Sequence, residues 1–157
     1  MGQYLIDNNV ISSYFSGQFS EKAMDFIAGV IDQIPNISVV TEIEALSWVN
    51  PDKSKEAIVQ EFIQDATVLG LTPDVVSQCI KIRRNKKIKT PDAIIAATAF
   101  VHKLTLITSD SDFKSIQNFG SQCEIQYRNL TIKSWCIENK LITLPNNLPT
   151  PPKHSSP

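Results

Sequence analysis

The chain has 157 residues, of which 42% are hydrophobic and 20% are charged, and this composition is ordinary for one globular domain with a proper core. No apolar run approaches the roughly 18 residues of a membrane span, and the first residues lack the basic segment of a signal peptide, so we expect neither membrane insertion nor export. Three cysteines without a CxxC spacing argue against a disulfide framework and favour free thiols in a reducing cytoplasm.

Short apolar segments alternate with helical patterns along most of the chain. Buried strands are expected at 4–6, 37–40, 67–71 and 104–108, with an edge strand at 124–127. Helices are expected from residue 10, over 20–34, from residue 41, and over 53–66, 75–84 and 91–100, with a short helix that begins within residues 109–113. This alternation predicts a three-layer α/β/α domain with a mainly parallel sheet. We place the domain at residues 1–130 and a C-terminal extension at 131–157, whose proline-rich end we expect to be poorly ordered.

Local signals predict where two of these helices begin. Thr41 and Glu44 have the Thr-x-x-Glu spacing of a capping box, which predicts a helix N-terminus at Thr41. Pro91 suits the first turn of the helix that continues to residue 100. Asp92 then lies in that first turn, where the helix dipole stabilises its charge. The small apolar side chains that follow allow close approach of neighbouring backbones and predict a central position for this helix.

Charge is distributed unevenly along the chain. Residues 1–80 contain 11 acidic and 3 basic side chains, whereas residues 81–157 contain 5 acidic and 12 basic ones. Six cations lie within nine positions without an intervening acid: Lys81, Arg83, Arg84, Lys86, Lys87 and Lys89. Such a run is usually a solvated helix face, and about half of it would face any one way. Because it leads directly into Asp92, a polyanion-binding function is the alternative to that interpretation.

Four acidic side chains are expected at one edge of the predicted sheet. Asp7 and Asp110 directly follow apolar strands, and Glu44 and Asp92 are predicted in first turns of helices that right-handed crossovers bring to the same edge. Gathered carboxylates raise each other's pKa unless a hard cation neutralises them, and oxygen ligands suit Mg²⁺ or Mn²⁺. Together with a basic rim that holds phosphate, this arrangement favours metal-assisted hydrolysis of a phosphodiester.

Four segments of the sequence, 5–11, 38–46, 92–99 and 106–113, resemble the four motifs of PIN domains, in order and with compatible spacing. The resemblance covers residues 4 to about 128 and is strongest to VapC-type toxins of toxin–antitoxin modules. It implies that Asp7, Glu44, Asp92 and Asp110 bind metal and act in catalysis, with Asp112 as an auxiliary acid. It also implies that the Thr108 hydroxyl braces Asp7, and it puts Asn8 beside that site.

The resemblance further implies a Mg²⁺- or Mn²⁺-dependent endoribonuclease that acts in the cytoplasm, forms a homodimer and is inhibited by an antitoxin. In this interpretation the basic run holds RNA phosphates through Arg83, Arg84, Lys86, Lys87 and Lys89. A receiver domain is disfavoured because no adjacent acidic pair follows the first strand, and a haloacid-dehalogenase-like phosphatase because the first strand lacks Asp-x-Asp. A degenerate PIN domain that only binds RNA or protein is the alternative function.

Several assignments within the site have alternatives. Asn8 and Asn9 stand where Thr or Ser with Asn or Cys is more usual in the family, which affects the hydrogen bonds around Asp7. Glu42 is the alternative to Glu44 as a metal ligand, and Glu44 is preferred because of its spacing from Thr41. Trp48 is interpreted as a packing residue, with a dimer or antitoxin groove as the alternative.

Overall fold

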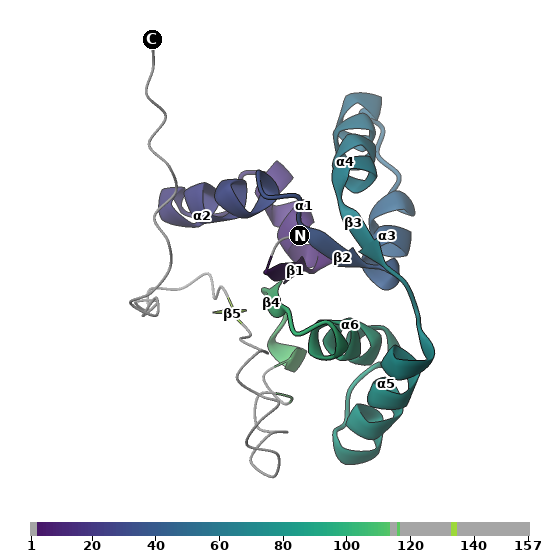
Figure 1. Cartoon of the computed structure of the whole chain (residues 1–157). Coiled ribbons are helices and arrows are strands. Elements are labelled where there is room, and N and C mark those ends of the chain that lie inside the picture. Colours follow the sequence, from purple (N-terminus) through teal and green to yellow (C-terminus); the bar gives the residue numbers. More distant parts are fainter. Residues whose placement is uncertain (1–2, 114–115, 117–132, 135–157) are drawn as a thin grey trace.

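The computed structural model describes residues 3–113, 116 and 133–134, and Figure 1 traces its elements. In chain order these are β1 (Tyr4–Ile6), α1 (Asn8–Phe15), α2 (Glu21–Ile31), β2 (Asn36–Ser38), α3 (Val39–Leu46), α4 (Lys53–Asp65), β3 (Thr67–Leu69), α5 (Pro73–Asn85), α6 (Thr90–Val101), β4 (Thr105–Thr108), the 3-10 helix η1 (Ser111–Phe113) and β5 (Lys133–Ser134). The predicted edge strand at 124–127 lies outside the described residues, as do two of the three cysteines, while Cys79 is a buried free thiol.

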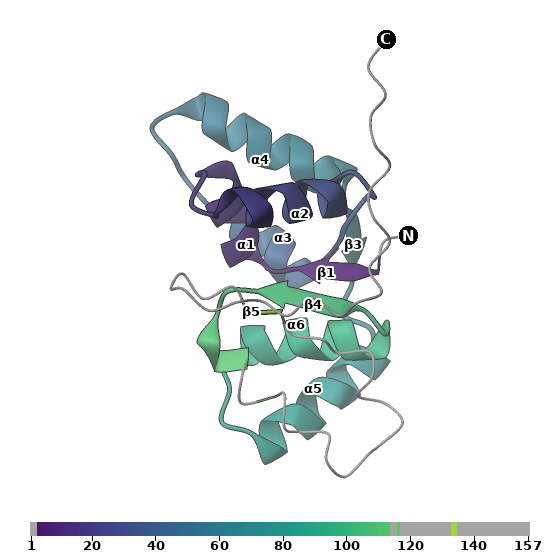
Figure 2. The same cartoon turned by 90° about the vertical axis from the view of Figure 1, so that its left-hand side faces the viewer.

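The strands form one parallel sheet in the order β3-β2-β1-β4-β5. Helices lie on both faces of this sheet, with α1, α2 and α4 on one side and α5 and α6 on the other (Figure 2). The structure therefore confirms the predicted three-layer α/β/α arrangement. β5 lies beyond the domain boundary predicted at residue 130, and it pairs with β4, so the sheet includes residues of the predicted extension.

Each face of the sheet has its own apolar core. One core packs sheet residues Tyr4, Ile6, Ile37 and Ile107 against helices α1 to α4. The other packs Leu5, Leu69 and Leu106 against α5 and α6. Successive strand residues point to opposite faces, so the apolar run of β1 serves both cores. α6 contributes mainly small buried side chains (Ala93, Ala96, Ala97 and Ala99), which confirms the predicted central position of this helix.

The third helix begins earlier than the sequence predicts. Ser38 is its N-cap, and its hydroxyl accepts a hydrogen bond from the Thr41 backbone N–H at 3.0 Å. The capping box predicted from Thr41 and Glu44 is therefore wrong, because Thr41 already lies in the first turn. Val39 and Val40, predicted as the end of a strand on account of their β-branched side chains, instead open the helix. A satisfied N-cap outweighs the small β-propensity of two valines.

The pairing of β1 with β4 positions the site. Tyr4, Leu5 and Ile6 align with Thr105, Leu106 and Ile107. The next residue of each chain segment, Asp7 or Thr108, therefore emerges at the same point of the sheet's carboxyl edge. The Asp7 backbone N–H donates to the Ile107 carbonyl at 3.1 Å, so the two segments are still hydrogen-bonded where the site begins.

Candidate metal centre

Asp7 is the most buried of the predicted site acids, with 5% of its surface exposed. Its Oδ2 accepts a hydrogen bond from the Thr108 hydroxyl at 2.7 Å. Burial raises the pKa of Asp7 to about 6; the hydrogen bonds from the Thr108 hydroxyl and the Asn8 backbone N–H lower it, and the charges of Glu44 and Asp92 raise it. Asp7 is therefore a carboxylate that the fold holds at an electrostatic cost.

The Thr108 hydroxyl connects three parts of the site. Besides donating to Asp7, its oxygen accepts hydrogen bonds from the Asp110 backbone N–H at 3.0 Å and from Asn9 Nδ2 at 3.2 Å. Asn9 Oδ1 in turn accepts from the Ser109 N–H at 3.2 Å. Because Thr108 is fully buried, these bonds exchange poorly with water and fix the β4–η1 turn against α1.

The contact between Asn9 and Thr108 is one that the sequence analysis missed. Asn8 was expected beside the site, and it contributes there through its backbone N–H to Asp7. Asn8 also lines a groove between α1, α3 and α4, while the side chain of Asn9 donates a hydrogen bond to the Thr108 hydroxyl. Two adjacent asparagines cannot be told apart by sequence pattern, because only the start of α1 at Asn8 decides which one faces β4.

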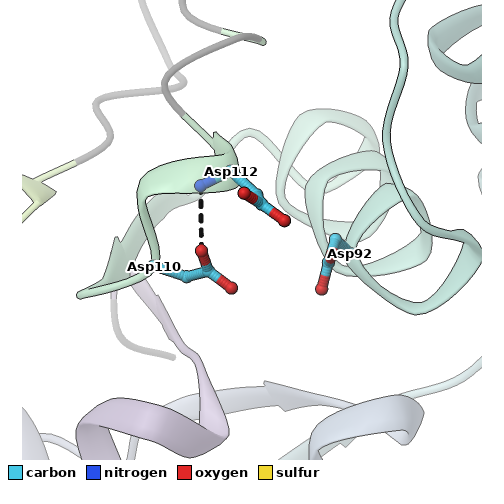
Figure 3. A group of neighbouring side chains, drawn as sticks. All are labelled: Asp92, Asp110 and Asp112. Carbon is cyan, nitrogen blue, oxygen red and sulfur yellow. Dashed lines mark hydrogen bonds between the residues drawn. The ribbon is translucent and has the colours of Figure 1, made fainter.

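Asp92, Asp110 and Asp112 form a cluster in which one carboxylate oxygen of each lies within 4.8 Å of those of the others. Figure 3 shows them converging from three places in the fold: Asp92 comes from the first turn of α6, Asp110 from the turn after β4 and Asp112 from η1. The Asp112 backbone N–H donates to Asp110 Oδ1 at 2.8 Å, which holds the second and third acids at a fixed separation.

Asp92 carries an orphaned oxygen. Its Oδ2 is buried and has no hydrogen-bond partner among the residues that the structure describes. Burial and the charge of Asp110 raise the pKa of Asp92, the nearby Lys89 ammonium lowers it, and the charge of Asp112 raises it. A buried carboxylate oxygen without a donor, next to two further carboxylates, has the chemistry of a ligand to a hard cation such as Mg²⁺ or Mn²⁺.

Glu44 lies in the second turn of α3, and its pKa is raised by partial burial and by the charge of Asp92. The charge interactions of Glu44 with Asp7 and Asp92 put these three acids in one electrostatic group, although Glu44 lies outside the close cluster of Figure 3. Glu42, the alternative ligand, lies in the first turn of the same helix.

The basic run divides in the structure. Lys89 directly precedes α6, and its Nζ lies 3.6 Å from Asp112 Oδ2. Arg83 and Arg84 occupy the last turn of α5 with exposed side chains, Lys86 caps that helix, and Lys87 is exposed in the following turn. None of these four forms an ion pair with a residue in the described part of the chain. Within the basic run, all of which the structure describes, Lys89 is thus the residue that forms an ion pair with the acidic cluster.

A groove of about 430 Å³ opens beside the site between α1, α3 and α4. Glu44 and Asn8 lie on its wall, together with the apolar side chains of Phe15, Trp48 and Ile58. These three apolar side chains are 39% to 46% exposed, so the lining of the groove combines accessible apolar surface with an acidic group. The packing function predicted for Trp48 accounts for only part of its surface.

Comparison with known proteins identifies the fold and the family. The family model described as PIN domain matches residues 4–118. The chain belongs to the PIN domain family. The acids at the carboxyl edge of the sheet all lie within the region that the family model matches. A search of curated proteins found no match.

Several solved structures share this PIN fold. A toxin–antitoxin complex from Klebsiella pneumoniae contains a chain that is 26% identical, with a TM-score of 0.58, covering 72% of this chain and 92% of that one. VapBC2 from Rickettsia felis, bound to a promoter DNA fragment, aligns with 15% identity and a TM-score of 0.63 over 85% of this chain and 98% of that one. DNA-bound VapBC from Salmonella typhimurium aligns with 19% identity and a TM-score of 0.62 over 87% and 100%.

Within the described part of this PIN domain, none of the helices combines the length and the apolar character that crossing a membrane requires.

Proposed function

We propose that this PIN domain is a Mg²⁺- or Mn²⁺-dependent endoribonuclease and the toxin of a toxin–antitoxin pair. Two observations together carry the proposal. The carboxylates of Asp92, Asp110 and Asp112 converge, and the buried Oδ2 of Asp92 lacks a hydrogen-bond donor within the described residues. Family membership and the similarity to chains from toxin–antitoxin complexes support a VapC-like nuclease. We extend the proposal to RNA as the substrate and to the cytoplasm as the place where the protein acts.

The chain's own residues suggest a division of labour around the ion. Asp92, Asp110 and Asp112 would hold it directly, and Asp7 and Glu44 would face it or its waters from the neighbouring segments. A bound divalent ion supplies a water of lowered pKa and neutralises charge on the phosphoryl oxygens. The hydroxyl of Thr108 keeps Asp7 oriented toward this group, and the η1 turn keeps Asp110 and Asp112 apart.

The basic side chains at the end of α5 and in the segment after it are proposed to hold the RNA backbone. An acidic centre repels a polyanion, so binding needs cations nearby, and each phosphate contact releases counterions. Arg83 and Arg84 have exposed side chains in the last turn of α5, and Lys87 has an exposed side chain in the segment that leads from α5 to α6 and the cluster. Neutralising Arg84, Lys86 and Lys87 together should weaken RNA binding and flatten its salt dependence, with Mn²⁺ affinity largely unchanged. Unaltered RNA affinity and salt slope would leave these residues as a solvated surface.

Cleavage of labelled single-stranded RNA tests the central proposal. We expect cleavage that needs Mg²⁺ or Mn²⁺, stops in excess EDTA, and is lost in Asp92→Asn and Asp110→Asn. Asp65→Asn, which changes an exposed carboxylate on α4, is the matched control and should cleave normally. A single-stranded DNA of the same sequence separates ribonuclease from general nuclease activity. Cleavage that persists in EDTA would overturn the metal mechanism, and Mn²⁺ binding without cleavage would favour a degenerate, binding-only PIN domain.

The groove between α1, α3 and α4 is the surface that we propose for the antitoxin. Its apolar side chains would hold an amphipathic segment, and a basic residue of that segment would be drawn toward Glu44 in the lining of the groove. Co-expression with the product of an adjoining small open reading frame tests this. We expect wild type to retain the partner and Ile58→Glu, which puts a charge on the groove wall, to lose it. Retention by the Ile58→Glu variant would exclude this groove.

A homodimer would cover a second surface, which we call the apolar face. It comprises exposed apolar side chains from α3, the edge strand β3, α5 and the residues that directly follow α3 and β3: Ile43, Leu46, Val49, Val68, Leu71, Val76 and Ile80. The elements α3, β3 and α5 lie along the right of Figure 1. An exposed sheet edge flanked by apolar side chains is an aggregation hazard unless it is paired or covered. A second copy of the chain is the occupant that the homodimer proposal assigns to this face.

A further inference from the structure

Among the described residues, Lys89 brings a basic side chain against the acidic cluster. The Lys89 ammonium lies 3.6 Å from Asp112 Oδ2. Its backbone is anchored as well, because the Lys89 carbonyl accepts the Ala93 N–H at 3.0 Å as α6 begins. Burial and the Asp110 charge raise the pKa of Asp92, while the Lys89 ammonium lowers it. One lysine, fixed three residues before Asp92, thus acts on two of the three clustered acids.

The position of Asp112 has a support that is independent of Lys89. Its backbone N–H donates to Asp110 Oδ1 at 2.8 Å, so removal of the lysine leaves the η1 turn in place. The remaining effect of Lys89 on the cluster is then its charge. Without metal, three carboxylates within 4.8 Å repel one another, and an ammonium beside them relieves that repulsion. With metal, the same ammonium repels a divalent cation.

We propose that Lys89 is a built-in counter-cation of the acidic cluster, which stabilises the metal-free protein and lowers the affinity of the cluster for a divalent cation. This inference rests on the proposed metal-dependent function and adds to it a residue that sets the metal requirement. Lys89 is a positioning residue in this proposal.

The effect should be moderate because water screens the pair. The Lys89 side chain is 77% exposed and that of Asp112 is 50% exposed. Charge interactions of exposed groups are weak, but a divalent cation doubles the repulsion, so we expect Mn²⁺ to bind Lys89→Gln about fivefold more tightly than wild type. Lys89→Arg keeps the charge and should bind like wild type. Lys87→Gln removes an exposed cation two residues away and is the matched control.

Isothermal titration of the full-length, metal-free proteins with MnCl₂ measures this directly, and thermal unfolding gives a second readout. In EDTA, Lys89→Gln should unfold at a lower temperature than wild type. In saturating Mn²⁺ that deficit should disappear, because the ion takes over the neutralisation. A merely structural contribution of Lys89 would lower both midpoints alike.

The outcomes separate this inference from the proposed function. If wild type binds Mn²⁺, Asp92→Asn does not, and Lys89→Gln binds as wild type does or more weakly, the counter-cation is refuted while the metal site stands. If wild type itself fails to bind Mn²⁺ or Mg²⁺, both the proposed function and this inference fall. An equal gain in Lys87→Gln would also overturn the proposal, because the effect would then belong to net charge.

Discussion

Replacing Asp7 by Asn should stabilise the metal-free protein while it disables the site. The pKa of Asp7 is raised from 3.8 to about 6, mainly by burial, and since one pKa unit corresponds to about 1.4 kcal/mol, the charged carboxylate costs the fold about 3 kcal/mol above pH 6. Asn has no charge, and it keeps the oxygen that accepts the Thr108 hydroxyl. We therefore expect the free energy of unfolding in EDTA at pH 8 to rise by about 2–3 kcal/mol.

The pH dependence gives the sign of this argument. The folded pKa of Asp7 lies above its unfolded value, so the folded state binds the extra proton between about pH 4 and pH 6. Ionisation of Asp7 lowers the stability of wild type as the pH rises through that window, and this contribution is absent from Asp7→Asn. The gap between the two proteins should be small at pH 4, should open up to about pH 6 and should stay constant above it.

Urea unfolding in EDTA at pH 4, 5, 6 and 8 measures the gap, with Asp25→Asn, an exposed carboxylate on α2, as the control that should show none. Saturating Mn²⁺ should reverse the order, because at a metal concentration of 1,000 times the dissociation constant wild type gains about 4.1 kcal/mol, which exceeds the stabilisation expected for Asp7→Asn. The reasoning would be refuted if Asp7→Asn were less stable than wild type at pH 8 in EDTA. It would also be refuted if the difference in free energy of unfolding between the two proteins were the same at every pH.

Three further predictions concern particular contacts. Thr108→Val removes the hydroxyl that donates to Asp7 and accepts from Asn9, so the free energy of unfolding in urea at pH 8 should fall by about 2 kcal/mol. NMR titration should show a further rise in the pKa of Asp7, and an unchanged pKa would contradict the cause assigned to the Thr108 hydrogen bond. Ser38→Ala removes the N-cap of α3 and should cost about 1 kcal/mol in the same assay, whereas an intact stability would make the cap dispensable. Leu71→Glu puts a charge on the apolar face, and light scattering should find a monomer with unchanged circular dichroism; a dimer would exclude this face.

Much of the architecture follows from local sequence. The short apolar segments and the helical periods between them specify a parallel α/β sheet, and a parallel sheet brings its carboxyl ends to one edge. The positions of Asp7, directly after β1, and of Asp110, two residues after β4, at this edge were therefore predictable. Local signals were weaker at helix starts: two valines favoured a strand, and the Ser38 hydroxyl, three residues before the N–H that it accepts, decided for a helix.

What tertiary structure alone decided is which side chains meet. Asp7 and Thr108 are 101 positions apart, and only the β1–β4 register makes them neighbours. The choice of Asn9 over Asn8 depends on where α1 begins, and the choice of Lys89 among six cations depends on the turn that joins α5 to α6. The raised pKa of Asp7 likewise depends on burial. Periodicity and propensity concern neighbours along the chain, whereas charge interactions and desolvation depend on distance and exposure in space, which the chain acquires only when the layers pack.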